Sequence, residues 1–88
     1  MRQVQKTILV IAQHDKTEAL RMASGLTLLD DRVRVAALGG LNDDSETALQ
    51  LEALDFAEVP VDSLDPDSDA GMGQLADAIL AADAVYVI

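Results

Sequence analysis

Hydrophobic residues along this chain occur in two alternating patterns. Aliphatic and β-branched residues fill positions 7–12 without a break, and mostly apolar runs, interrupted by Arg34 and including Tyr86, occupy positions 33–38 and 84–88. The unbroken run is typical of a strand that is buried on both faces of a parallel sheet. Between the runs, hydrophobic residues recur at spacings of three and four, which places them on one face of a helix. The pattern therefore predicts strands that alternate with helices.

The first predicted helix follows directly on the first strand. Asp15 is expected to cap it, and Glu18, three residues later, is placed to complete a capping-box-like pair. Gly25 lies inside the helix at a cost of about 1 kcal/mol relative to alanine, and we expect it to let the helix backbone pack closely on the sheet. The expected core face consists of Ala19, Met22, Ala23, Leu26 and Leu29.

A second helix is expected to begin at Asn42 or Asp43 and to run through Leu54. Its candidate core positions are Ala48, Leu49, Leu51 and Leu54. Residues 56–61 predict a third, weaker strand, and Pro60 indicates that this strand ends early or lies near an edge. Residues 62–73 are expected to form a polar loop. A third helix follows, with candidate core positions Met72, Leu75, Ala76, Ile79 and Leu80.

The predicted order is β-α-β-α-β-α-β, which favours a parallel four-stranded sheet in a three-layer α/β/α fold. With 88 residues, we expect a single domain that spans positions 1–88. Half of the residues are hydrophobic but there is no Trp, so aliphatic side chains must build the core. So small a domain would gain buried surface from oligomerisation. The chain has no cysteine, which excludes disulfides, thiolate metal sites and cysteine nucleophiles.

Charge is distributed unevenly along the chain. All six basic residues lie in the first 34 positions, whereas residues 35–88 contain twelve acids and no Lys or Arg. The net charge of -10 argues against nucleic-acid binding and against docking on anionic membranes. The acids serve solubility, or they form a face that steers toward a basic protein partner. No segment is long enough to span a bilayer or to act as a signal peptide, so we expect a cytoplasmic protein.

The loops that follow the first two predicted strands are the candidate ligand-binding site. In parallel α/β sheets, ligands bind beyond the carboxyl ends of the strands. Gln13, His14 and Asp15 follow the first strand, and Gly39 and Gly40 follow the second. His14 is the only histidine and is a candidate acid, base or ligand contact. The alternative is structural, with Asp15 acting only as a helix cap and the glycines only as a turn.

No recognised catalytic or cofactor motif is present. The loop after the first strand lacks the glycines of a dinucleotide fingerprint, and no G-x-S-x-G is found. A phosphoacceptor receiver needs a lysine on a late strand, but the last lysine is Lys16. Residues 62–69 are most simply a solvated linker, and their cation binding stays open. Three acids nevertheless have the spacing of the first EF-hand ligands, namely Asp65, Asp67 and Asp69. We therefore expect no catalytic residue, resident metal or cofactor.

Five stretches of the chain together resemble the DsrE/DsrF-like family, which includes the sulfur-relay proteins of the TusBCD type. They are "KTILVIAQHD", "EALRMASGLTLL", "VRVAALGG", "LEALDFAEVPV" and "ADAVYVI". The resemblance implies a parallel α/β/α fold and assembly into trimers or hexamers. It also implies a persulfide-carrying cysteine in the loop after the third strand of active members. Residues 60–65 of this chain contain no cysteine there, and serine cannot hold a persulfide because the relay depends on thiolate exchange.

The resemblance, taken with the missing cysteine, implies a non-catalytic protein. We expect an oligomeric accessory or partner-binding component linked to sulfur metabolism or sulfur relay. Members of that family usually continue beyond the fourth strand, whereas this sequence stops at Ile88, so we expect an open sheet edge that self-association would cover. The alternative hypothesis is a module that binds a nucleotide or another metabolite through the strand-tip loops.

Overall fold

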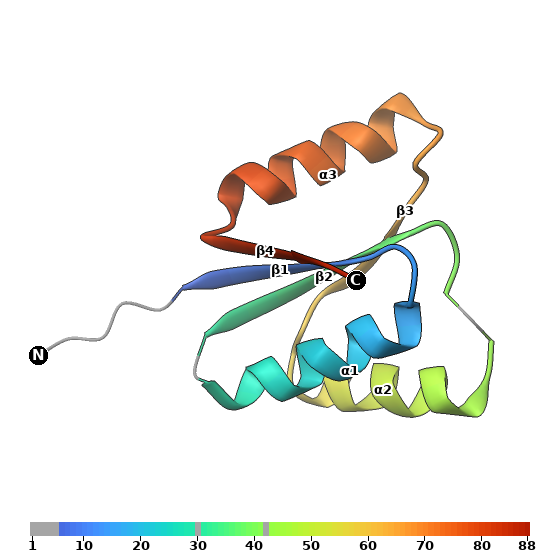
Figure 1. Ribbon diagram of the computed structural model, residues 1–88, viewed down its shortest axis with the longest axis vertical. Coiled ribbons are helices and arrows are strands. Elements are labelled where there is room, and N and C mark those ends of the chain that lie inside the picture. The colour runs from blue at the N-terminus through green and yellow to red at the C-terminus, as the bar shows by residue number, and fades with distance from the viewer. Residues whose placement is uncertain (1–5, 30, 42) are drawn as a thin grey trace, which may run out of the picture.

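A four-stranded sheet with three helices forms the computed structural model, which describes residues 6–29, 31–41 and 43–88 (Figure 1). The strands are β1 (Thr7–Ala12), β2 (Arg32–Leu38), β3 (Val61–Leu64) and β4 (Ala84–Val87). The helices are α1 (Lys16–Leu26), α2 (Ser45–Phe56) and α3 (Asp69–Ala81), and a 3-10 turn, Thr27–Leu29, follows α1.

All strand pairs are parallel, and the sheet order is β3-β2-β1-β4. The predicted three-layer α/β/α fold with a parallel four-stranded sheet is therefore confirmed. The first two crossovers step in one direction across the sheet, and the third returns to the far side of β1. As a result α1 and α2 cover one face and α3 covers the other (Figure 1). The direction of the crossovers changes between β1 and β4, which is a topological switch point.

The core has two layers, one on each face of the sheet. On the α1–α2 side, the buried residues are Ile8, Val10, Ala12, Ala19, Leu20, Ala23, Val33, Val35, Ala37, Leu54 and Val59. On the α3 side, they are Leu9, Ile11, Ala36, Leu64, Leu75 and Ala78. The β1 residues alternate between the two lists, as expected for a strand that is covered on both faces. The α3 layer is much the smaller of the two.

The prediction of a strand over residues 56–61 is wrong. Helix α2 continues to Phe56, and β3 begins only at Val61. The helix ends in a Schellman turn, in which the N–H of Val59 donates to the carbonyl of Leu54 at 2.9 Å and the N–H of Glu58 donates to that of Asp55 at 3.0 Å. The turn buries both Val59 and Leu54, so the apolar residues read as a strand instead close the helix.

The expected edge position near Pro60 is confirmed, because β3 is an outer strand of the sheet. Pro60 lies directly before β3, where its missing N–H costs no ladder bond. Its carbonyl accepts from the N–H of Val35 at 2.9 Å. The expected polar loop over residues 62–73 is wrong, because this segment contains most of β3 and the beginning of α3.

Polar side chains cap α1 and α2, as the sequence predicts. The cap of α1 is confirmed, since Asp15 Oδ1 accepts from the N–H of Glu18 at 3.1 Å. The cap of α2 is Asp44 rather than Asp43, and its Oδ1 accepts from the N–H of Thr47 at 2.8 Å. Asn42, the other predicted cap, lies outside the described residues.

Several predicted core positions on the helices are exposed. On α2, Leu54 is buried as expected, but Ala48 and Leu49 face solvent. On α1, Ala19 and Ala23 are buried, and Gly25 is exposed with open space where a Cβ would be. The expected close packing at Gly25 is therefore wrong.

Helix α3 buries a different face from the one predicted. Leu75 is buried, but the remaining predicted core positions, Met72, Ala76, Ile79 and Leu80, are exposed. The face that packs on the sheet contains the small residues Gly71 and Ala78. The start of α3 lies so close to the preceding loop that a Cβ on Gly71 would be 2.2 Å from the carbonyl oxygen of Asp65. This close approach fixes the rotation of the helix about its axis.

Candidate functional site

The loop after β1 lies at the switch point, where a ligand would be expected. Gln13 and His14 are exposed, and their backbone N–H groups both donate to the carbonyl of Ile88 at 2.9 Å. Ile88 in turn donates its N–H to the carbonyl of Ile11 at 3.0 Å. In other α/β proteins, backbone N–H groups of this loop bind anions. Here the N–H groups of Gln13 and His14 are already hydrogen-bonded to Ile88, the residue after β4.

The loops after β1 and β2 are joined to each other by Lys16. Its Nζ donates to the carbonyl of Gly40 at 2.6 Å. Gly39 adopts a φ of 80°, in the left-handed region that favours glycine, and its N–H donates to the carbonyl of Leu64 at 2.8 Å. Sequence reasoning missed Lys16, whose place in the first turn of α1 was the only signal that it would reach this edge.

All five predicted ligand-binding candidates therefore lie at the carboxyl end of the sheet. A cavity of about 250 Å³ at this end is lined by Gly39, Ser63, Leu64 and Asp65. It lies beyond β2 and β3 and does not include His14. Gly40 is exposed and Asp15 caps α1. The arrangement fits a set of loops that hold one another closed.

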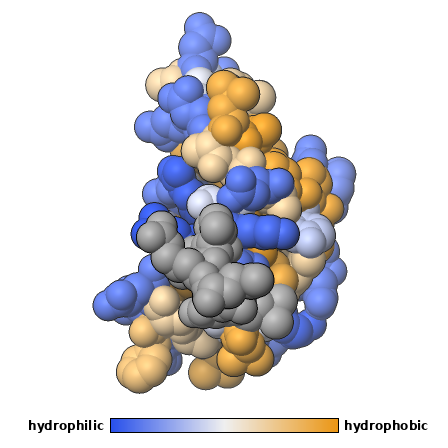
Figure 2. Space-filling model, turned by 90° about the vertical axis from the view of Figure 1, so that its left-hand side faces the viewer, coloured by the Kyte–Doolittle hydropathy of each residue, from blue (hydrophilic) through white to orange (hydrophobic). Residues whose placement is uncertain are grey.

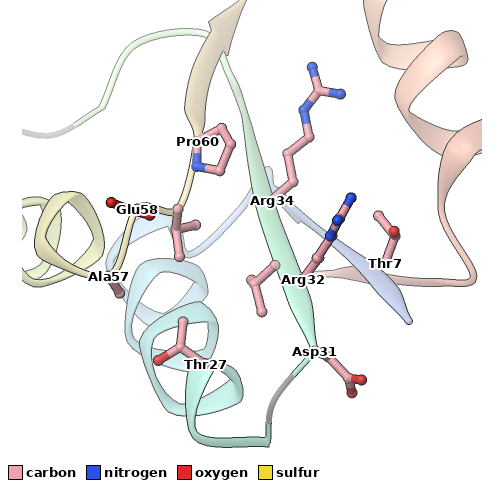
Figure 3. A pocket seen from close by; sticks show the side chains of 10 residues that line it. Thr7, Thr27, Asp31, Arg32, Arg34, Ala57, Glu58 and Pro60 are labelled. Carbon is pink, nitrogen blue, oxygen red and sulfur yellow. The ribbon is translucent and has the colours of Figure 1, made fainter. Parts of the chain in front are cut away.

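A larger cavity, of about 540 Å³, lies at the opposite, amino end of the sheet (Figure 3). Strand β2 begins at Arg32, but its pairing with β3 begins only at Val35. The cavity occupies the notch beside the first residues of β2, which β3 does not reach. Figure 3 shows Arg34 and Thr27 on different sides of β2. Its charged lining residues are Asp31, Arg32, Arg34 and Glu58.

The charges in this notch balance one another. Two arginines and two acids line it, and the Arg34 guanidinium also donates to Asp62 Oδ2 at 3.1 Å. A cavity with this balance has no net attraction for an anion. It also lies at the end of the sheet opposite to that at which parallel α/β proteins bind ligands.

Exposed hydrophobic side chains gather on α3 and β4. We call the following five residues the α3–β4 surface: Met72, Ile79, Leu80, Val85 and Val87. Leu80 is 85% exposed and Val87 is 57% exposed. Figure 2 shows hydrophobic side chains over the upper part of the molecule, where Figure 1 places α3, and others over the α1–α2 layer below.

The two elements contribute to the same side of the sheet. The opposite flank of α3 carries Gln74 and Asp77, which line a cavity with Arg34 and Asp62 over β2 and β3. Helical spacing therefore puts Met72 and Ile79 on the flank of α3 that is nearer to β4. On β4, Val85 pairs with Leu9 and Val87 pairs with Ile11. Because Leu9 and Ile11 lie on the face of the sheet that α3 covers, Val85 and Val87 lie on that face too.

The aspartate-rich segment before α3 is organised by its own hydrogen bonds. Asp65 Oδ1 accepts from the N–H of Asp67 at 2.9 Å, and Ser68 Oγ accepts from the N–H of Gly71 at 2.9 Å and caps α3. Within residues 6–29, 31–41 and 43–88, no group of three acidic or histidine side chains is placed to hold a metal ion. None of the helices in this described part is both long and apolar enough to cross a membrane.

Comparison with known proteins gives one structural likeness. No family model matches the chain, and no curated protein matches it. The fold is similar to that in the crystal structure of yeast ynu0, YNL200c, with a TM-score of 0.57 and 25% sequence identity. The match covers 66% of this chain and 25% of the yeast chain, so the region compared is a small part of that protein. The likeness agrees with the α/β arrangement and assigns no activity.

Proposed function

We propose that this protein is a non-catalytic binding partner, which associates with other protein through the α3–β4 surface. One observation carries the proposal. Four large apolar side chains are exposed on the α3 side of an outer strand, Met72 and Ile79 from α3 and Val85 and Val87 from β4, and Leu80 is exposed beside them on the outer face of α3. Groups of exposed apolar side chains mark interaction sites, and an exposed strand edge invites association.

The alternative function, binding of a nucleotide or metabolite at the strand tips, has less support. The backbone donors of Gln13 and His14 are used by Ile88, and Lys16 is used by Gly40. The cavity nearby, at about 250 Å³, is smaller than the roughly 300–1,000 Å³ of typical ligand pockets.

The resemblance to DsrE-like proteins supplies a biological context for this proposal. The loop after β3 contains no cysteine, so the chain has no thiolate on which to carry sulfur. We propose a cytoplasmic accessory component of a sulfur relay, which contributes binding rather than chemistry. A second copy of the chain is one candidate partner, in the trimer or hexamer that the resemblance implies.

Site-specific photocrosslinking tests the proposal. Leu80 on the α3–β4 surface and Leu28 beyond α1 are each 85% exposed, so they form a matched pair. We expect a photoreactive amino acid in place of Leu80 to give a discrete crosslinked adduct in the native host, and the same residue in place of Leu28 to give none. The mass of the adduct distinguishes a second copy from another protein. Equal adducts from both positions, or none from either, would contradict the proposal.

A further inference from the structure

We propose that the α3–β4 surface binds one amphipathic helix of a different protein, and that the flanks of this helix carry Lys and Arg. The inference rests on the proposed association function and names the partner's chemistry. It draws on the shape of the surface and on its charge.

The surface has the shape of a corner. Val85 and Val87 form its floor on the sheet, and Met72 and Ile79 form its wall on the flank of α3. Adjacent strands are about 4.8 Å apart and packed helices about 8–10 Å apart, so one helix covers roughly two strands. Helix α3 packs against β1 and β3, which leaves room for one further helix above β4.

A helix fits this corner better than a strand does. A strand added to the edge of β4 would pair with its backbone but would leave Met72 and Ile79 exposed. A helix that lies beside α3 buries the wall and the floor together, through apolar residues at spacings of three and four.

Charge indicates the partner's polar flanks. Residues 35–88 include all of α3 and β4 and contain no Lys or Arg. Exposed acids lie at both ends of the surface: Asp69 is in the first turn of α3, and Asp83, whose Oδ2 accepts from the N–H of Thr7 at 2.8 Å, lies directly before β4. Asp69 precedes Met72 by three residues and so lies on the same side of the helix. Complementary charge on the partner is therefore positive.

The same charges disfavour a second copy as the occupant. Two copies that met through this surface would bring Asp69 and Asp83 of each together with no base from either α3 or β4. Each chain also carries a formal net charge of -10. Like charges that are brought together at an interface oppose association.

Three labelled peptides of equal length test the inference with the full chain. The first is a model amphipathic helix with Leu on one face and Lys on the other, the second has Glu in place of Lys, and the third is a scramble of the first. We expect fluorescence anisotropy to show that the first peptide binds at least about tenfold more tightly than the other two, as required when shape and charge both contribute. Equal binding of the scramble, or of the acidic peptide, or no binding, would overturn the proposal.

Variants locate the binding site and separate its two contributions. We expect Met72→Gln and Val87→Thr each to weaken binding about fivefold or more, as loss of apolar contact does, whereas Leu28→Gln leaves it unchanged. Asp69→Asn should weaken binding and reduce its salt dependence, while Asp77→Asn on the opposite flank should do neither. Thermal melting of each variant shows whether it is folded. Binding by folded Met72→Gln and Val87→Thr variants that matches the unsubstituted protein would overturn the assignment.

The two proposals fail in different ways. If Leu80 crosslinks to a partner but the basic peptide does not bind, the association surface stands and the helix is wrong. If Leu80 gives an adduct of twice the chain mass and the basic peptide does not prevent it, the occupant is a second copy and the inference is overturned. If Leu80 gives no adduct, the proposed association function itself is contradicted.

Discussion

Glu58 is the one described non-glycine residue with a positive φ, which is 60°. It stands at the position after the α2 cap where a Schellman turn usually has glycine. A left-handed conformation costs an L-residue about 1–2 kcal/mol. The turn persists because Val59 and Leu54 are buried against each other and their backbones are hydrogen-bonded. Local strain at one residue is therefore balanced by burial at its neighbours.

The substitution Glu58→Gly is expected to stabilise the protein. Removing the Cβ relieves the strained φ, and the greater freedom of glycine in the unfolded chain offsets part of this gain, so we expect a net increase of about 1 kcal/mol in the free energy of unfolding. Urea denaturation measures it. Glu58→Ala keeps the Cβ and is the control, which should change stability little. A gain of the same size in the alanine variant would show that charge, not backbone strain, is the cause.

Two glycines in α3 are expected to respond in opposite directions to alanine. A Cβ on Gly71 would meet the backbone of Asp65 at 2.2 Å, whereas a Cβ on Gly73 would meet nothing within 4 Å. We expect Gly71→Ala to lower the free energy of unfolding by about 1–3 kcal/mol through overpacking. Gly73→Ala should raise it by about 0.5–1 kcal/mol through helix propensity. Thermal and urea unfolding measure both changes, and a stabilised Gly71→Ala variant would show that the loop can move away.

At the scale of elements, strand β1 was predictable to the residue and β3 was not. The reason is that β1 is buried on both faces, so its apolar run is continuous and its limits coincide with the run. In contrast β3 is an outer strand of four residues, two of which, Asp62 and Ser63, are polar. The stronger apolar signal before it belonged to the end of α2 and its turn. With two polar residues among four, β3 has too few apolar side chains to produce a sequence pattern, whereas β4, also an outer strand of four residues, keeps an apolar run and was predicted.

The rotation of α3 was also beyond the reach of sequence periodicity. Met72, Ile79 and Leu80 form an apolar stripe that predicts the buried face, yet the helix packs on the sheet through Gly71 and Ala78. The close approach at Gly71 decides the packing, and no spacing rule reports it. Similarly, the sequence placed the candidate loops at one end of the sheet but did not reveal that Ile88 and Lys16 hold them closed.

The start of α2 gives a pH-dependent prediction. The pKa of Asp44 is lowered from its ordinary value of 3.8 because its carboxylate accepts hydrogen bonds from the side chain and then from the backbone of Thr47. A lowered pKa in the folded state means that this contribution to stability is present above the ordinary pKa and is lost as the pH falls through the folded value. We expect Asp44→Asn, which can still cap the helix, to lose less stability than the unsubstituted protein as the pH falls from about 5 to about 2. Melting temperatures across this range measure the difference, and parallel curves would show that Asp44 contributes nothing to the acid response.

For the molecule as a whole, the two faces of the sheet are unequal. Helices α1 and α2 together cover one face, and their contact is reinforced by Arg21 and Glu46 at 2.7 Å and by the hydroxyls of Thr17 and Thr47 at 3.3 Å. The other face is covered by α3 alone. Apolar side chains are exposed on both layers, with Leu49 and Phe56 on α2, but only the thin α3 layer leaves them exposed on the sheet itself, at Val85 and Val87 of the proposed binding surface.

This inequality predicts how backbone amides exchange with solvent. Strand β1 is paired on both sides and buried on both faces, so we expect its amides to exchange only through global unfolding, whereas those of β4 exchange faster through local opening. Hydrogen exchange followed by NMR on the isolated protein measures the two strands under one condition. Addition of the basic amphipathic peptide should slow exchange in β4 and α3 and leave β3 unchanged. If β4 is already as protected as β1 in the free protein, and this protection falls on dilution, a second copy covers the edge in solution, and the surface proposed for a different partner is already occupied.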